Sequence, residues 1–259
     1  AELLKTVEGD ENMERRLSAM TPLVLRNPKG AVALLNTLAG AGQPDEIRKG
    51  AYKSLESVND LETCKVLAAA VVTDDAWRKP SQLALKRICV HRKEPQAIWN
   101  GAFAPVLESA DNGGREALLA IVDSVACNES LAYLKKAVET DENPLRPAAL
   151  RSLARWPLFD AGDAWVAVAA AENVTADDIA AAERGIVRAI TRSEIKAKPD
   201  QRVKLAAKAI QKAPTPEFKQ AILGCYEKPS KDDRAAIKKH WKPLLNDANS
   251  NVVVRVEAL

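Results

Sequence analysis

Aromatic residues are scarce in this chain of 259 residues: they make up 4% of it, although 47% of the sequence is hydrophobic. The apolar residues are therefore mostly Ala, Leu and Val. Together with 28% charged residues, this composition favours helices, because Ala, Leu, Lys, Arg and Glu lose little conformational freedom there. Strands would need more β-branched and aromatic residues, and no stretch alternates cleanly with period two. We expect an all-α protein.

The residue types that usually carry chemistry are few and scattered. The two histidines, His91 and His240, stand far apart, and neither has a partner at metal-ligand spacing. No Gly-x-Ser-x-Gly motif is present, and no Cys has a nearby His at a spacing that would support catalysis, so no nucleophile is indicated. We therefore expect no enzyme, no metal and no cofactor. We interpret the four cysteines as buried thiols, with disulfides or metal ligands as the alternatives: Cys64, Cys89, Cys127 and Cys225.

Long hydrophobic runs are absent as well. No continuous apolar run approaches the roughly 18 residues that a membrane span needs. We expect a soluble protein without a membrane partner, either cytoplasmic or exported with its signal peptide removed. The net charge of +3 is too small to indicate a polyanionic partner by itself.

The chain does contain a repeat. In "DENPLRPAALRSL" (141–153), a turn-forming Asp-Glu-Asn-Pro leads into Arg146 and then into apolar residues at helical spacing. A second helical stretch, such as "EPQAIWNGAFAPVLESA" (94–110), lies between successive copies, so each unit is predicted to be two helices. Successive copies are 30 to 37 positions apart and are anchored at Arg15, Arg48, Arg78, Arg115, Arg146, Glu183, Lys219 and Arg255.

The repeat resembles the HEAT repeat of the armadillo-like helical class, best in 141–153 and in "DANSNVVVRVEAL" (247–259). The resemblance covers essentially the whole chain, as a single domain, 1–259. It implies a right-handed α-α superhelix of about seven two-helix repeats plus a final half repeat. It also implies that the anchor arginines bond to an acidic residue of a neighbouring repeat. Because the last unit stops after one helix, we expect a fragment of a longer chain or a partner on its end.

Several local signals refine this picture. "TADD" (175–178) predicts a capping box at a helix start. "DNGGRE" (111–116) lacks the Gly-Lys-Ser/Thr ending of a phosphate loop and is interpreted as a turn between helices. Helical spacing predicts these core residues: Ala149, Leu150, Leu153, Ile186, Val187, Ile190, Ile222 and Leu223.

Basic residues are concentrated near the end of the chain. Helical spacing places one set on one face of a helix and a second set on one face of the next helix. If the two faces adjoin, they form a surface that attracts phosphate or an acidic protein; the alternative is an ordinary solvated face. The first set is Lys204, Lys208 and Lys212, and the second is Arg234, Lys238 and Lys242.

Aromatic residues supply the other candidate sites. Trp241 adjoins the basic residues. A Trp on a basic helical surface resembles, in fold and charge, the HEAT-like alkylpurine DNA glycosylases. Excision of a base by such an enzyme needs a carboxylate, for which Asp232 or Asp233 is the candidate. Trp99 and Phe103 share a helix face and, if exposed, would anchor a partner peptide or a sugar ring. The alternative is that tryptophans pack between helices, and we interpret the five in that way: Trp77, Trp99, Trp156, Trp165 and Trp241.

The function hypothesis that follows is a non-catalytic scaffold that presents a curved helical surface to another protein. One alternative is a nucleic-acid-binding protein of the same fold. A second alternative is an accessory module of a multi-domain bacterial protein, exported from the cell.

Overall fold

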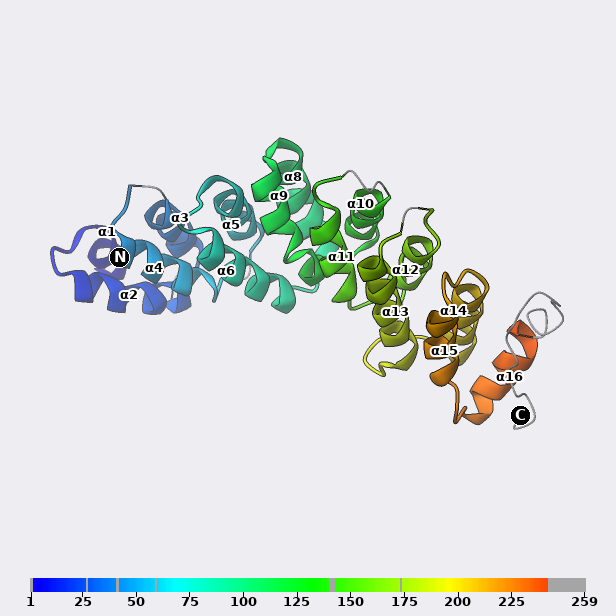
Figure 1. The fold of residues 1–259 in the computed structure, drawn as a ribbon. Coiled ribbons are helices and arrows are strands. Elements are labelled where there is room, and N and C mark those ends of the chain that lie inside the picture. The colour runs from blue at the N-terminus through cyan, green and yellow to red at the C-terminus, as the bar shows by residue number, and fades with distance from the viewer. Residues whose placement is uncertain are drawn as a thin grey trace. The chain divides into compact units, whose positions relative to one another are not determined.

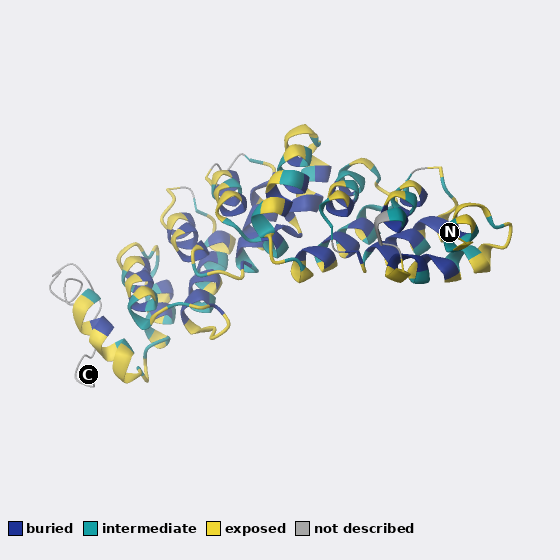
Figure 2. Cartoon of the chain, turned by 180° about the vertical axis from the view of Figure 1, so that it is seen from behind, coloured by how far each residue is buried: buried dark blue, intermediate teal, exposed yellow. Residues whose placement is uncertain are grey.

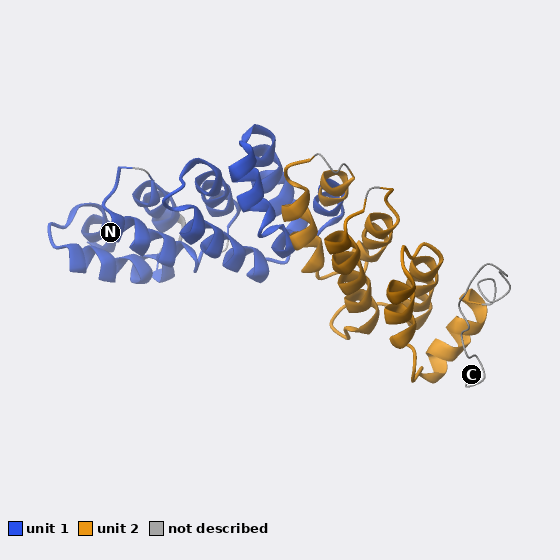
Figure 3. Ribbon diagram, in the orientation of Figure 1, with its two compact units in different colours: residues 1–133 blue, residues 134–259 orange. Residues whose placement is uncertain are grey.

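The computed structural model describes residues 2–26, 28–40, 42–58, 60–139, 143–172 and 174–241. All regular structure within these ranges is helical, which confirms the all-α prediction. Contacts divide the chain into two compact units, residues 1–133 and residues 134–259 (Figure 3). The final half repeat predicted at 247–259, with Arg255, lies outside the described residues.

Unit 1 is built from helices that pack in successive pairs: α1 on α2, α3 on α4, and α5 on α6 (Figure 1). Two of its helix starts are capped by Asp, because the Asp60 and Asp111 side chains accept from the backbone N–H groups of Thr63 and Gly114, each at 2.7 Å. The turn predicted at 111–116 is thus a capped helix start. The helices are α1 (Glu2–Gly9), α2 (Met13–Arg26), α3 (Pro28–Ala39), α4 (Asp45–Leu55), α5 (Leu61–Thr73), α6 (Arg78–His91), α7 (Pro95–Ile98), α8 (Ala104–Ser109) and α9 (Asn112–Leu119), with the 3-10 turn η2 (Val122–Val125).

Unit 2 continues in the same way, with α12 packed on α13 and α14 packed on α15 and α16. The predicted capping box is confirmed: the Asp178 N–H donates to Thr175 Oγ1 at 3.2 Å, and the Thr175 N–H donates to Asp178 Oδ2 at 3.3 Å. The helices of this part are α10 (Asn128–Val138), which begins in unit 1, α11 (Arg146–Ala154), α12 (Ala161–Ala169), α13 (Ala176–Thr191), α14 (Pro199–Gln211), α15 (Pro216–Gly224) and α16 (Lys231–His240).

Buried residues lie on the helix faces that point toward neighbouring helices of the same unit (Figure 2). Six of the eight predicted core residues are buried, whereas Val187 and Leu223 are half-buried. The core is largely Ala, Leu, Ile and Val, and the small Ala side chains let neighbouring helices approach closely. The helical spacing of apolar residues therefore located most of this core correctly.

A recurring arginine forms a hydrogen bond between successive helices. Among the described residues it stands within the first four positions of a helix and donates from Nε to a carbonyl in the last turn of the preceding helix. Those last carbonyls lack partners within their own helix and carry partial negative charge, so a guanidinium stabilises them. The bonds run from Arg16 to Val7 (3.1 Å), Arg48 to Ala39 (3.2 Å), Arg78 to Val71 (2.9 Å), Arg115 to Leu107 (2.9 Å) and Arg146 to Val138 (3.4 Å).

This pattern corrects three of the predicted anchors. In the first helix pair the bond comes from Arg16 and not from Arg15. The backbone N–H of Arg15 donates to the Asn12 side chain at the start of α2. In unit 2, Arg188 donates to the Ala154 carbonyl at 2.6 Å and Arg202 donates to the Ile190 carbonyl at 2.7 Å. Arg202 stands fourth in α14 and Arg188 stands in the last turn of α13, so neither bond comes from the aligned positions Glu183 and Lys219. A guanidinium that reaches a helix end can satisfy its carbonyls from either position.

The acidic partners of these arginines vary. Arg48 pairs with Asp74 and Arg146 pairs with Asp178, and both acids belong to the next pair of helices, as the resemblance implies. Arg78, by contrast, pairs with Asp75 in its own turn. The bond to the helix-end carbonyl is therefore more general here than the bond to a neighbouring repeat.

The stretch predicted as one helix at 94–110 is interrupted. The π-helical turn η1 (Trp99–Phe103) separates α7 from α8, and the Ala104 N–H reaches back to the Trp99 carbonyl. Pro105 explains the break: it has no N–H, and in a regular α-helix its ring would collide with the carbonyl of Gly101. A Cβ on Gly101 would lie 3.0 Å from Leu61 Cδ2, so the wider turn also lies close against α5.

Candidate functional site

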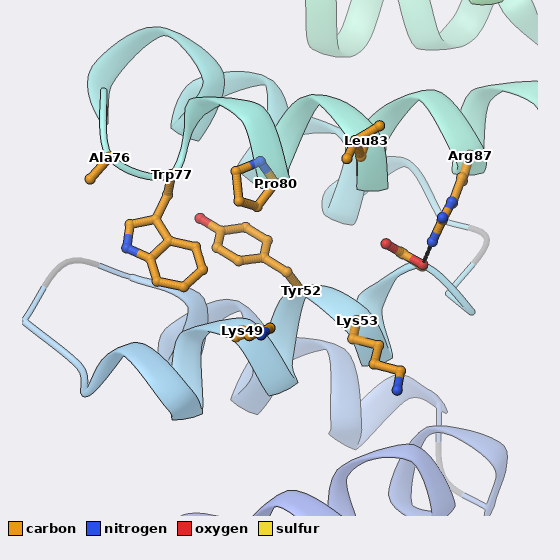
Figure 4. A pocket seen from close by; sticks show the side chains of 9 residues that line it. Lys49, Tyr52, Lys53, Ala76, Trp77, Pro80, Leu83 and Arg87 are labelled. Carbon is orange, nitrogen blue, oxygen red and sulfur yellow. Dashed lines mark hydrogen bonds and ion pairs between the residues drawn. The ribbon is translucent and has the colours of Figure 1, made fainter.

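A groove of about 530 Å³ lies between α4 and α6 in unit 1 (Figure 4). Its residues recur every three or four positions on each helix, which places them on one face of α4 and one face of α6. The α4 side is formed by Lys49, Tyr52, Lys53 and Glu56, and the α6 side by Ala76, Trp77, Pro80, Leu83 and Arg87. We call this feature the α4–α6 groove.

The floor of the groove is held by interlocking contacts. The Trp77 ring stacks on the Tyr52 ring, with centroids 5.4 Å apart and an interplanar angle of 24°, and the Arg48 guanidinium lies 4.6 Å from the centroid of Trp77. Arg48 is itself fixed by its ion pair with Asp74, and the Tyr52 hydroxyl donates to the Ala39 carbonyl at 3.3 Å. The floor is therefore ordered before anything binds to it.

The walls of the groove are apolar on one side and basic on the other. Leu83 on α6 is 52% exposed and, together with Pro80, makes this wall of the groove apolar. Lys49 and Lys53 on α4 are exposed and have no ion pair within the described part of the chain. Arg87 is paired with Glu56 and links the two helices at one end of the groove (Figure 4).

The basic residues predicted as an interaction surface are exposed, but acids accompany them. Lys204 and Lys208 lie on α14 and Lys212 directly follows it, whereas Arg234 and Lys238 lie on α16; Lys242 lies outside the described residues. Lys208 pairs with Asp163 of α12 at 2.8 Å. A hollow of about 250 Å³ beside Lys204 and Lys208 is also lined by Asp160 and Asp163. These carboxylates lower the positive potential that the sequence pattern suggested.

A further carboxylate organises the end of unit 2. Asp200 Oδ1 accepts from Lys239 Nζ at 2.9 Å and contacts His240 Nε2 at 2.8 Å. The hydrogen bond from Lys239, followed by the one from His240, lowers the pKa of the Asp200 carboxyl below its ordinary value. Asp200 therefore stays ionised near neutral pH and links the start of α14 to the end of α16.

The aromatic residues proposed as anchors are buried. Trp241 is 3% exposed, and its Nε1 donates to the Val203 carbonyl at 3.3 Å. Trp99 is 4% exposed and Phe103 is fully buried, with their ring centroids 6.2 Å apart. None of the three rings presents a free face to a ligand. Asp233, one of the two candidate carboxylates, accepts from the backbone and hydroxyl of Ser230 at the start of α16.

Trp77 was expected to pack between helices, and it lines the groove. Its position follows from a turn whose Asp74 accepts from the Trp77 N–H at 3.3 Å. One sequence signal pointed here: Leu83 is apolar but lies outside the core spacing of Ala84, Leu85 and Ile88. An apolar residue out of phase with the buried face marks an exposed apolar position.

The thiols depart in part from the sequence prediction. All four are free; Cys64 and Cys89 are buried, but Cys127 and Cys225 are only half-buried. A hydrogen bond with the Cys64 thiol, together with burial, raises the pKa of the Cys89 thiol, which therefore stays protonated at neutral pH. Within the described ranges, no cluster of three or more His, Cys, Asp and Glu residues is arranged to hold a metal ion.

Comparisons with known proteins add little. No protein-family model matches the chain, and no curated protein matches it. A solved structure described as an engineered protein is 15% identical, covering 91% of this chain and 98% of its own, with a TM-score of 0.30. At that score the likeness does not bear on the fold. Among the described helices, none has the length and apolar character needed to cross a bilayer.

Proposed function

We propose that this chain is a non-catalytic binding module of the HEAT-like helical repeat class, and that it holds a segment of another protein in the α4–α6 groove. The observation that carries the proposal is Leu83, 52% exposed beside the ordered Trp77–Tyr52 floor. The interhelical bonds of Arg48 and Arg146 support the HEAT-like assignment and, with it, a right-handed superhelix.

The dimensions of the groove suit this role. Its volume of about 530 Å³ is large enough for bulky side chains of a partner, which would shield Leu83 and Pro80 from water. Removing such apolar surface from water drives association. Because contacts with Tyr52 and Arg48 already order the Trp77 ring, binding loses little side-chain entropy at this point.

Replacing Leu83 with Asp is expected to weaken peptide binding at least about tenfold, equivalent to roughly 1.4 kcal/mol. The change removes apolar contact area and places a carboxylate where an apolar side chain would bind. Peptides are first selected from a random phage-displayed library against the wild-type chain. Their affinities for wild type and Leu83→Asp are then measured by fluorescence anisotropy.

The matched control is Leu158→Asp, since Leu158 is 45% exposed in the turn between α11 and α12 and lies outside the groove. Selected peptides should bind this variant as tightly as they bind wild type. The proposal is wrong if the library yields no peptide that binds, or if its peptides bind Leu83→Asp undiminished.

A nucleic-acid-binding function is the second candidate. It is favoured by exposed cations near the end of the chain that have no ion pair within the described residues: Lys204, Lys212, Arg234 and Lys238. Binding of this kind would weaken steeply as salt is raised, because bound phosphates release counterions. The interspersed Asp160, Asp163 and Asp200 oppose it.

For labelled single-stranded and duplex DNA, we expect anisotropy to show weak binding at low salt and none at about 0.15 M salt, where exposed charges are strongly screened. Submicromolar, salt-sensitive binding that is lost in a Lys204→Glu, Lys238→Glu double variant would instead establish the second candidate.

A further inference from the structure

We infer that the segment held in the α4–α6 groove is an acidic peptide that carries a bulky aliphatic or aromatic side chain. This inference rests on the function proposed above and adds the chemistry of the partner. It depends on which charges of the groove are already neutralised and on where they stand relative to the apolar wall.

The charge of the groove is uncompensated along one wall. Lys49 and Lys53 are one helical turn apart on α4, so both lie on the α4 side of the groove (Figure 4). Neither has an ion pair within the described residues. The acid of the lining, Glu56, is already bound by Arg87. A carboxylate entering the groove therefore meets free cations, whereas an incoming Lys or Arg meets repulsion.

The opposite wall of the groove favours an apolar side chain in the ligand. Pro80 and Leu83 present aliphatic surface from α6, across the groove from the two lysines (Figure 4). The Tyr52 hydroxyl of the floor already donates to the Ala39 carbonyl. An apolar side chain that packs on the Tyr52 ring therefore leaves this hydroxyl satisfied. The lysines and the apolar wall together fit a segment in which acidic residues flank an apolar one.

The charges set specificity more than affinity. Exposed ion pairs contribute little each, and salt screens them, so the lysines are expected to favour an acidic ligand about three- to tenfold in total. The apolar contacts with Leu83 supply the remainder. The two contributions are therefore separable by experiment.

The test uses two labelled synthetic peptides, each with a central leucine, flanked by glutamates in one and by glutamines in the other. Anisotropy titrations are made with the full chain, with a Lys49→Glu, Lys53→Glu double variant, and with a control double variant, Lys212→Glu, Lys238→Glu. The control reverses the charge of two lysines of unit 2 that have no ion pair within the described residues. Wild type and the control should bind the glutamate peptide about three- to tenfold more tightly than the glutamine peptide. The groove variant should lose this preference or invert it.

The outcomes separate this inference from the function on which it rests. If both peptides bind wild type equally and Leu83→Asp still weakens binding at least about tenfold, the groove is a peptide site without preference for acid, and the inference is overturned alone. If neither peptide binds at low salt and library selection also yields no binder, both fail. If the Lys49→Glu, Lys53→Glu changes abolish the binding of labelled duplex DNA but leave the binding of the glutamate peptide unchanged, the ligand is a nucleic acid and the inference is wrong.

Discussion

Replacing Arg146 with Ala is expected to lower the free energy of unfolding by about 3–5 kcal/mol, the range typical for removing one partner of a buried ion pair. Arg146 NH1 donates to Asp178 Oδ2 at 2.7 Å, and the two side chains are 9% and 7% exposed. Without the guanidinium, the buried carboxylate keeps the hydrogen bond from the Thr175 hydroxyl but loses its cationic partner. Urea unfolding, followed by both circular dichroism and tryptophan fluorescence, measures the loss and checks that the two signals change together.

The matched control is Arg78→Ala. Arg78 occupies the equivalent position at the start of α6 and makes the same bond to a helix-end carbonyl, but its acidic partner, Asp75, has a side chain that is 86% exposed. We expect a loss of about 1 kcal/mol, mainly from the carbonyl bond. Equal losses in the two variants would show that burial of the acid is not what makes Arg146 important.

The pH dependence gives an independent check. Burial acts to raise the pKa of the Asp178 carboxyl, but hydrogen bonds from Arg146 and Thr175 outweigh it, and the folded pKa lies below the ordinary value. A depressed folded pKa stabilises the protein above the unfolded pKa of about 3.9, and this stabilisation is lost as pH falls through the folded value. The difference in stability between wild type and Arg146→Ala should therefore be largest near neutral pH. It should shrink as the solution is made acidic, because the Asp178 carboxyl is protonated first in the folded variant, where burial is less opposed, and then in wild type.

The second large effect is expected at Gly185, in the middle of α13. Replacing Gly with Ala in a helix normally stabilises it by up to about 1 kcal/mol. Here a Cβ would lie 2.3 Å from Nε1 and 2.4 Å from Cε2 of Trp165. Trp165 is 1% exposed, so its rigid ring has no room to move. We expect Gly185→Ala to destabilise the fold by about 3 kcal/mol, the upper part of the range for overpacking, measured by the same urea unfolding.

Gly224→Ala is the control with the opposite sign. Gly224 ends α15, and a Cβ there would meet nothing within 4 Å. This substitution should leave stability unchanged or raise it by a few tenths of a kcal/mol, through helix propensity and a less flexible unfolded chain. A stabilised Gly185→Ala would mean that α12 and α13 can separate to admit a methyl group.

Local sequence rules located most of the helices and the capped start of α13. The cap at Thr175 and the apolar spacing around Leu153 report on atoms within one helical turn, so one sequence contains them. The π-helical turn at Trp99 was missed because helical spacing does not register one extra residue per turn. Pro105 was the available warning, since Pro within a helical pattern breaks the hydrogen-bond ladder.

The groove could not be predicted in the same way. It requires Trp77, from the turn before α6, to lie against Tyr52 of α4, and the distance between two helices of different pairs is not encoded in spacing along either one. The spacing of the basic residues wrongly indicated a surface without acids, for a related reason. Lys208 looked unpaired in sequence, but Asp163 lies 45 positions away and reaches it only through packing of α12 near α14.

The arginine bonds between paired helices have a kinetic consequence. Each joins residues 7 to 9 positions apart, so it closes a very short loop and loses little chain entropy in forming. Chains dominated by contacts of this kind fold fast, because the search for each partner is brief. During synthesis, a pair such as α3 and α4 can form its Arg48 bond as soon as Arg48 has left the ribosome, before the later helices have been synthesised.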